Sequence, residues 1–438
     1  MGADIVLWML ALLVTLIVMG VHIGIALALC SGLGVWLMIG SFEAAVSIMG
    51  NTAYEAVRKD VFAVIPLFVL MGDIISRSGA AGDLYRICDR GLKRLPGRLA
   101  IATIAGNTVF AAVTGVSIAA AAAFSRIAYP EMKKLGYKDT FSVGAVAGSA
   151  CLGMLIPPSI LLIVWAILTE MSVGALFIAG IIPGIVLALL FSGYVVTAAK
   201  LRPHVAPSSN QDLVVLSSEE RKQELIGGLG ILGLIFLVIG GLWLGLFTPT
   251  EAAGFGAIGA LVIGLMKGMR KAELMDAILQ AGRTTAPIMF LLITAQMYSR
   301  LLAMGGAVNF IQSIFLGLGV DPWIILMIMA VIWIILGMLV DSVSIILLTV
   351  PIFAPLAMAL GFNPIAFAIF GILVIEAGLL TPPFGLLVYT VKGALPDKTV
   401  SLGTIFKGSA PYFVLILVAA MLVIVVPSLA TWLPRVML

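Results

Sequence analysis

Two octapeptides place a pair of prolines behind a glycine within long apolar runs. They read GMLIPPSI (Gly153–Ile160) and GLLTPPFG (Gly378–Gly385). Proline has no backbone N–H and clashes with the carbonyl one turn earlier, so two prolines in succession interrupt a helix and leave carbonyl groups free. Those oxygens, together with a hydroxyl such as Ser159 or Thr381, suit a small hard cation such as Na⁺. The N–H groups that begin the next half-helix suit an anion.

Local signals predict two further features. Thr381 followed by Pro382 is typical of an N-cap with proline at the first helical position, so the second half-helix is predicted to begin there. Gly82–Leu95 carries its apolar residues on one face, which predicts a surface helix at the inner membrane interface. Lys267–Gln280 is its expected counterpart.

The motif inventory gives no support for an enzyme. The chain has 438 residues but only two histidines, His22 and His204, and it contains no HExxH, GxSxG, P-loop or paired-carboxylate motif. Asp73, Asn107 and Glu376 are isolated polar residues within or beside apolar runs, and their spacing assigns them no role. The sequence therefore predicts no catalytic residue, no cofactor and no metal other than Na⁺.

Long apolar segments must position these motifs. The chain is 62% hydrophobic and 11% charged, and apolar runs of about 20 residues, enough to cross roughly 30 Å of hydrocarbon, recur throughout. A transmembrane barrel would show short alternating segments instead. We predict an all-α polytopic membrane protein with spans at 5–19, 23–40, 61–77, 140–171, 173–199, 225–246, 249–266, 285–304, 364–391 and 409–433.

The basic residues predict the orientation of these spans. Cytoplasmic loops carry the excess of Lys and Arg in membrane proteins. If the N-terminus lies outside, only four of the 25 basic residues fall on the outer side, namely Arg58, Lys59, Arg300 and Arg435. We therefore predict a multi-pass protein with its N-terminus outside.

Two apolar stretches do not fit as single spans. Leu99 to Ser125 carries no charge, is longer than one crossing and shorter than two, and has basic residues at both ends. This predicts a re-entrant hairpin over 98–128, because one long tilted helix would leave a basic flank outside. The stretch 322–360 is either a second re-entrant hairpin or two full spans. The lone Asp341 near its middle is costly in hydrocarbon, which predicts that it faces a polar site.

The chain also contains an internal repeat. The two octapeptides begin 225 residues apart, and YPEMKKLGY (129–137) aligns with APLAMALGF (354–362) at the same offset. An odd number of crossings separates the two proline motifs, so the second copy is predicted to be inverted. Inverted repeats with two interrupted helices indicate a secondary transporter whose binding site lies near the midplane at the breaks.

At these motifs the chain resembles the large membrane subunit of tripartite ATP-independent periplasmic (TRAP) transporters. The matching stretches are IPLFVLMG (65–72), LGMLIPPSILLIVWA (152–166), LFIAGIIPG (176–184), GLFTPTEAA (245–253), DSVSIILLTVPIFAPL (341–356) and GLLTPPFG (378–385).

The resemblance implies an ion-transporter-superfamily fold with a scaffold and an elevator-type transport domain. The expected scaffold comprises spans and a connecting segment at 1–60, spans at 172–284 with a cytoplasmic loop at 200–224, and a C-terminal span at 392–438. The first half of the expected transport domain is 61–171, with hairpin 98–128 and broken helix 140–171. Its second half is 285–391, with hairpin 322–360 and broken helix 364–391.

The resemblance also implies two Na⁺ sites, each between a hairpin tip and the loop of a broken helix. The first would comprise Gly115, Val116, Ser117, Gly153, Ile156, Pro157 and Pro158. The second would comprise Val340, Asp341, Ser342, Leu380, Thr381 and Pro382. Val116 stands where the family commonly has a hydroxyl residue, so main-chain carbonyls would serve there. For the solute we expect contacts from Ser117, Ser159, Ser342 and Thr381, with Arg300 attracting an anion.

The function implied is Na⁺-coupled uptake of a small organic anion across a bacterial or archaeal inner membrane. Carboxylates, sugar acids and sulfonates all remain open as solutes. The expected partners are a small four-helix membrane subunit, a periplasmic substrate-binding protein and the lipid bilayer, with no nucleic acid. The alternatives are a stand-alone Na⁺/dicarboxylate symporter of the same superfamily, a channel and an intramembrane enzyme.

Overall fold

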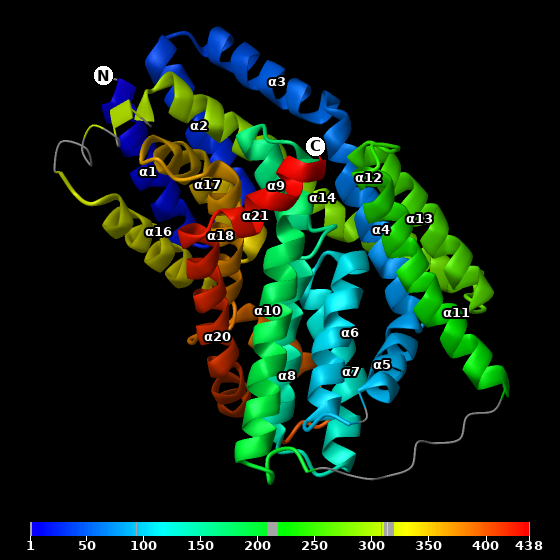
Figure 1. Cartoon of the computed structure of the whole chain (residues 1–438). Coiled ribbons are helices and arrows are strands. Elements are labelled where there is room, and N and C mark those ends of the chain that lie inside the picture. Colours follow the sequence, from blue (N-terminus) through cyan, green and yellow to red (C-terminus); the bar gives the residue numbers. More distant parts are fainter. Residues whose placement is uncertain are drawn as a thin grey trace.

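Helices make up all the regular structure in the described part of the chain, which confirms the all-α prediction (Figure 1). This computed structural model describes residues 2–92, 94–207, 218–307, 309–310, 313 and 319–437. Residues 208–217 of the predicted loop 200–224 therefore lie outside the described residues. The chain begins with α1 (Gly2–Val18), α2 (Ile23–Ile39), α3 (Phe42–Arg58), the 3₁₀ turn η1 (Asp60–Ala63), α4 (Val64–Arg77) and α5 (Ala80–Gly91).

Six helices of the described residues are long and apolar enough to cross a membrane, or seven if the bent pair Asp60–Arg77 and Ala80–Gly91 counts as one span. The remaining predicted spans correspond to shorter apolar helices or to helices with a break. The chain is therefore a multi-pass membrane protein. The six are Val173–Leu201, Arg221–Trp243, Pro249–Met266, Lys271–Met304, Ser342–Ala359 and Leu402–Val425.

Two predicted boundaries are wrong. The span expected at 409–433 is two helices, α20 (Leu402–Val425) and α21 (Ser428–Met437), because Pro427 stands between them. The surface helix expected at Lys267–Gln280 is not separate either. It is the first part of α14 (Lys271–Met304), which runs unbroken into the span predicted to begin at residue 285.

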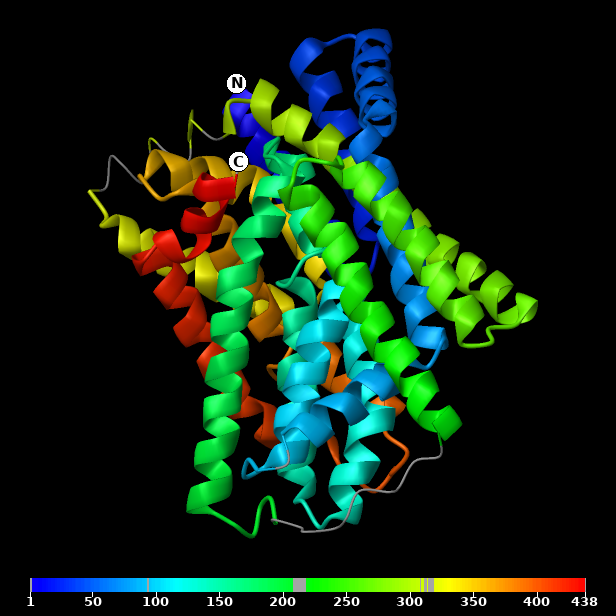
Figure 2. The ribbon, with the colours of Figure 1, turned by 45° about the vertical axis from the view of Figure 1, so that its right-hand side comes forward.

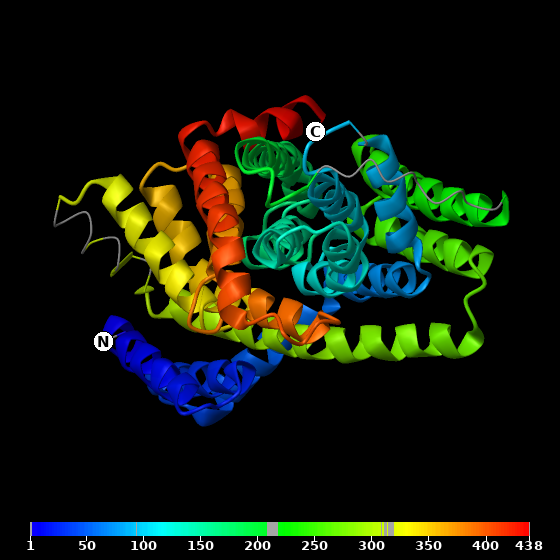
Figure 3. The same cartoon turned by 90° about the horizontal axis from the view of Figure 1, so that it is seen from below.

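The long helix α14 extends along one side of the molecule and separates α1, α2 and α3 from the central helices of residues 98–201 (Figure 3). It packs closely against α2 because that helix presents glycines. A Cβ atom at Gly34 would lie 2.5 Å from a methyl carbon of Leu301, and one at Gly24 would lie 2.6 Å from the ring of Phe290. Small residues at such positions let membrane helices approach closely.

Beside α4 and α5, at the right of Figure 1, lie α11 (Ser218–Ile235), the π-helical segment η3 (Phe236–Gly240), α12 (Gly241–Trp243) and α13 (Pro249–Met266). α13 begins with a capping box, in which Thr248 accepts from the Glu251 N–H and the Glu251 carboxylate accepts from the Thr248 N–H. An ion-pair cluster around two buried carboxylates joins α5, α11 and the end of α13. In it, Asp83 pairs with Arg86 and Lys267, and Glu224 pairs with Arg86 and Arg90.

The ends of several central helices meet at one end of the molecule (Figure 2). The Lys138 N–H donates to the Val205 carbonyl at 3.0 Å. Nearby, Lys133 forms an ion pair with Asp397, so the end of the helix Ser117–Lys134 contacts the segment before α20. Hydrogen bonds from Lys133 and Thr399 hold the pKa of the Asp397 carboxyl well below its usual range. This end carries the basic residues that predict the cytoplasmic side.

Candidate functional site

A helical hairpin occupies the first apolar stretch that does not fit as a single span. Its arms are α6 (Arg98–Thr114) and α7 (Ser117–Lys134), which pack on each other, and Gly115 and Val116 form the tip. Gly115 has a φ of +61°, the left-handed conformation that ends α6. The turn rules out the alternative of one long tilted helix.

The first broken helix lies directly against this tip. It consists of α8 (Asp139–Ala150), the 3₁₀ turn η2 (Cys151–Met154), a loop and α9 (Ile160–Thr169). The Ile160 N–H donates to the Gly115 carbonyl at 3.3 Å. A Cβ atom on Gly115 would lie 2.4 Å from the Pro158 carbonyl oxygen, and one on Gly153 would lie 3.0 Å from the Ser117 nitrogen. The first predicted set of residues is therefore brought together around main-chain atoms.

The loop of the first broken helix is enclosed on its other side by α10 (Val173–Leu201). Glycines on α10 make room for it, since a Cβ atom at Gly180 would lie 2.3 Å from the Leu155 carbonyl oxygen and one at Gly184 would lie 2.6 Å from the Ile156 side chain. Ser159 is fully buried and is the N-cap of α9, where its hydroxyl donates to the Met154 carbonyl. The Ser159 hydroxyl is thus already used within the loop.

A second hairpin occupies the other such stretch. Its arms are α16 (Pro322–Gly337) and α17 (Ser342–Ala359). Asp341 is the N-cap of α17, since its carboxylate accepts from the Ser344 N–H at 3.0 Å and from the Ser344 hydroxyl at 2.6 Å. Both oxygens of the partly buried Asp341 carboxylate therefore accept hydrogen bonds within the tip.

The second broken helix consists of α18 (Pro364–Gly378), a loop and α19 (Leu386–Ala394). The prediction that Thr381 caps this half-helix is wrong. α19 begins after Gly385, whose φ of +57° supplies the turn, and the Thr381 hydroxyl instead donates to the Gly378 carbonyl. Gly337 and Gly378 pack back to back, since a Cβ atom on Gly337 would lie 2.7 Å from the Gly378 Cα. The first arm of the second hairpin therefore touches α18.

The two halves of the site differ in exposure. Residues 151–160 in the first loop are all buried, whereas Pro382, Pro383 and Phe384 in the second loop are not. Both Pro-Pro bonds, 157–158 and 382–383, are cis. Arg300 is exposed and lies near the end of α14. Its role in attracting the solute stays a prediction.

Glu376 is a site residue that the sequence analysis left without a role. It lies in the last turn of α18, is 1% exposed, and accepts a hydrogen bond from the Ser342 hydroxyl at 2.8 Å. Ser342 is the first residue of α17, so this bond ties α18 to the second hairpin tip. An acidic residue in the middle of an apolar run is the signal that marks it in the sequence.

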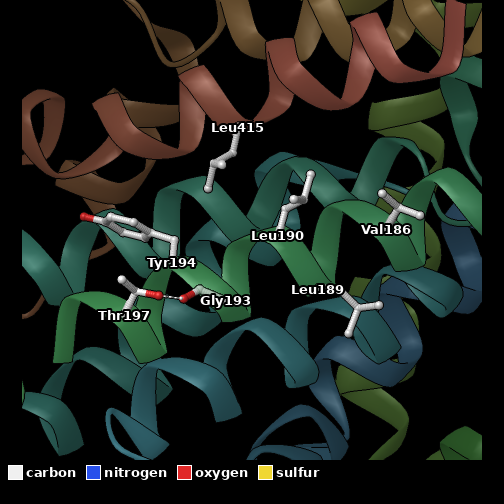
Figure 4. A pocket seen from close by; sticks show the side chains of 7 residues that line it. All are labelled: Val186, Leu189, Leu190, Gly193, Tyr194, Thr197 and Leu415. Atoms are coloured by element: carbon white, nitrogen blue, oxygen red, sulfur yellow. Dashed lines mark hydrogen bonds between the residues drawn. The ribbon is translucent and has the colours of Figure 1, made fainter. Parts of the chain in front are cut away.

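An apolar groove of about 580 Å³ lies away from this site, between α10 and α20 (Figure 4). No predicted site residue lines it. It is lined by Val186, Leu189, Leu190, Gly193, Tyr194, Thr197 and Leu415.

The chain matches over residues 10–429 the family described as "Tripartite ATP-independent periplasmic transporter, DctM component". It belongs to this family. A C4-dicarboxylate TRAP transporter large permease protein of Pseudomonas aeruginosa is 32% identical over 386 residues, covering 87% of this chain and 88% of that protein. An ectoine TRAP transporter large permease protein of Halomonas elongata is 29% identical over 430 residues, covering 97% of this chain and 98% of that protein.

The TRAP permease fold also resembles that of a solved transporter of low sequence identity. The YdaH transporter of Alcanivorax borkumensis superposes with a TM-score of 0.63 at 14% identity, covering 90% of this chain and 89% of that one. This likeness concerns the fold alone. Both relatives of this TRAP permease described above are named as transporter permeases, which confirms the prediction that it is not an enzyme.

Proposed function

We propose that this chain is the large permease of an uptake system that uses a Na⁺ gradient to import a small organic anion. It works with a small four-helix membrane subunit and a periplasmic substrate-binding protein in the inner membrane, with its N-terminus outside. Relatives named for C4-dicarboxylate, ectoine and sialic acid support a small polar metabolite as the solute. The observation that carries the proposal is the contact between the first hairpin tip and the first broken helix.

Sodium binding is proposed where main-chain oxygens of different segments meet. At the first tip, Gly115 lies against the Pro158 carbonyl group and Gly153 lies against Val116 and Ser117, which supports a site where carbonyl groups of both segments share one ion. At the second tip, Ser342 reaches α18 through Glu376, and Thr381 closes the loop that follows α18. The positive end of each half-helix then favours the anionic solute.

We also propose that the two halves form an inverted repeat that moves as an elevator against a scaffold. One part of the expected division is revised. A Cβ atom at Gly144 on α8 would lie 2.2 Å from the Gly408 carbonyl oxygen, and one at Gly408 would lie 2.1 Å from the Thr140 carbonyl oxygen. Helices in backbone contact do not slide freely past each other, so we place α20 with the moving unit. α10 encloses the first loop and is placed there too.

Uptake into proteoliposomes tests the proposed function. When the small subunit and the binding protein of the same system are present, we expect labelled solute to accumulate under an inward Na⁺ gradient and not when choline replaces Na⁺. The trial solutes are a C4-dicarboxylate, ectoine and a sialic acid. Uptake by the large chain alone would favour the stand-alone symporter instead, and uptake that is indifferent to Na⁺ would contradict the coupling.

Accessibility of the two tips tests the elevator movement. Ile118 and Leu339 lie beside the first and second tips and are 37% and 57% exposed. We expect single cysteines at these positions, in a background lacking Cys30, Cys88 and Cys151 that retains uptake, to change reactivity towards membrane-impermeant reagents when Na⁺ and solute are added. A cysteine at Trp8 on α1, which is 73% exposed, is the control and should not respond. Tips that react from one face in every condition would contradict an elevator.

A further inference from the structure

Glu376 is a buried carboxylate without a counter-charge in the described part of the chain. Three acidic residues are buried there. Asp83 and Glu224 each pair with two basic side chains, whereas no Lys or Arg lies within ion-pair distance of Glu376. Buried charges in proteins are normally paired or coordinate a metal ion, because an isolated charge is poorly solvated by the protein interior.

The surroundings of Glu376 consist of oxygen groups from both hairpins. Its Oε1 accepts from Ser342, the first residue after the second tip, at 2.8 Å, while Oε2 has no hydrogen-bond partner. Ser117, the first residue of the arm that follows the first tip, lies beside the same carboxyl group. It is fully buried, and its hydroxyl makes no hydrogen bond of good geometry, either to the Glu376 carboxyl group or to any other described group. On the remaining side the Cys151 thiol points at the Glu376 main-chain carbonyl, with the sulfur 3.8 Å away.

Two unpartnered buried oxygens, one of them on a carboxylate, are a suitable ligand set for a hard monovalent cation. Carboxylate and hydroxyl oxygens are the ligands that such ions prefer, and a cation would supply the counter-charge that the protein lacks here. We propose that Glu376 binds a Na⁺ ion between the two hairpin tips, with the hydroxyls of Ser117 and Ser342 as further ligands. This inference rests on the proposed function, because it takes Na⁺ as the coupling ion.

The proposed site differs from the two tip sites in its chemistry. It shares Ser117 and Ser342 with those sites, but it adds the buried carboxylate of Glu376 and draws on both hairpins at once. A single ion held by both tips would link the two halves, so that Na⁺ binding in one half is sensed in the other.

The test is Na⁺-dependent thermal stability of the purified full-length chain, with choline at equal ionic strength as the reference. A ligand that binds only the folded state raises the unfolding temperature as its concentration rises. We expect Glu376→Gln to raise the Na⁺ concentration needed for half of this effect by at least about tenfold. In choline, we expect this variant to be at least as stable as the parent chain, because an unpaired buried charge is removed. Glu376→Asp keeps the charge but shortens the side chain by one methylene group. The carboxylate then lies farther from the two serines, so this variant should also weaken the response to Na⁺.

The control is Glu43→Gln on the exposed face of α3, which should leave the Na⁺ response unchanged. If the parent chain responds to Na⁺ and both Glu376 variants respond at the same concentration, this inference is overturned while Na⁺ coupling stands. A variant that is less stable in choline but keeps the parental Na⁺ midpoint would make Glu376 a structural residue and also overturn it. If the parent chain itself does not respond to Na⁺, the proposed coupling fails first.

Discussion

Replacing Gly115 by alanine is expected to abolish uptake almost completely. The added Cβ would lie 2.4 Å from the Pro158 carbonyl oxygen, and the backbone φ of +61° disfavours any side chain. The tip must then withdraw from the loop of the broken helix, which separates the main-chain oxygens proposed to hold Na⁺. Because displacements of about 1 Å at a site can cost about a hundredfold in rate, we expect uptake in proteoliposomes to fall at least that far.

The matched control for this variant is Gly40→Ala. Gly40 also has a positive φ, +76°, but a Cβ atom there would meet nothing within 4 Å. The control therefore carries the conformational cost of about 1–2 kcal/mol without the collision. Uptake by Gly40→Ala should remain close to that of the parent chain. Equal losses in the two variants would show that the Gly115 effect is a general folding defect and not a loss of the contact with Pro158.

Asp83→Asn is expected to lower the stability of the chain strongly. The Asp83 side chain is 3% exposed and pairs with Arg86 and with Lys267, whose own side chain is 10% exposed. Removing one partner of a buried pair leaves the other charge uncompensated, at a cost of about 3–5 kcal/mol. Gly227 leaves room for this carboxylate, since a Cβ atom there would lie 2.1 Å from its Oδ2.

The unfolding temperature in detergent measures this effect. The comparison is Glu55→Gln, which removes an exposed ion pair. In that pair the Arg58 side chain is 69% exposed and the Glu55 side chain is 60% exposed. Exposed pairs contribute about 1 kcal/mol or less, so this variant should melt close to the parent chain. An Asp83→Asn protein as stable as Glu55→Gln would mean that the cluster joining α5, α11 and α13 adds nothing to the fold.

The proposed function of this chain depends on the places where its regular helices stop. The hairpin tips and the loops of the broken helices place main-chain oxygens inside the protein, where an uninterrupted helix would have used them for its own hydrogen bonds. The local bonds of Ser159, Asp341 and Thr381 show how the chain satisfies most of the polar groups exposed by these breaks. Beside these breaks, Oε2 of Glu376 and the hydroxyl of Ser117 are among the buried oxygens that have no hydrogen-bond partner.

The main elements of the fold could be predicted from the sequence because they depend on the composition and periodicity of single segments. The apolar runs predicted a helical membrane protein, the paired prolines at Pro157 and Pro382 predicted the two breaks, and the uncharged stretch from Leu99 to Ser125 predicted the first hairpin. The motifs around these residues also identified the family. Each of these signals is local, since proline and glycine act on the backbone of their own segment.

Contacts between distant segments were decided only by the tertiary structure. Thr381 and Pro382 are typical of a helix start, yet α19 begins after Gly385. The loop folds back so that the Thr381 hydroxyl donates to the Gly378 carbonyl and cannot cap a helix. The meeting of Glu376 with Ser342, the backbone contact of Gly144 with Gly408 and the continuity of α14 likewise follow from packing. A sequence states which groups a segment offers, but the partner that satisfies a buried group is selected by the whole fold.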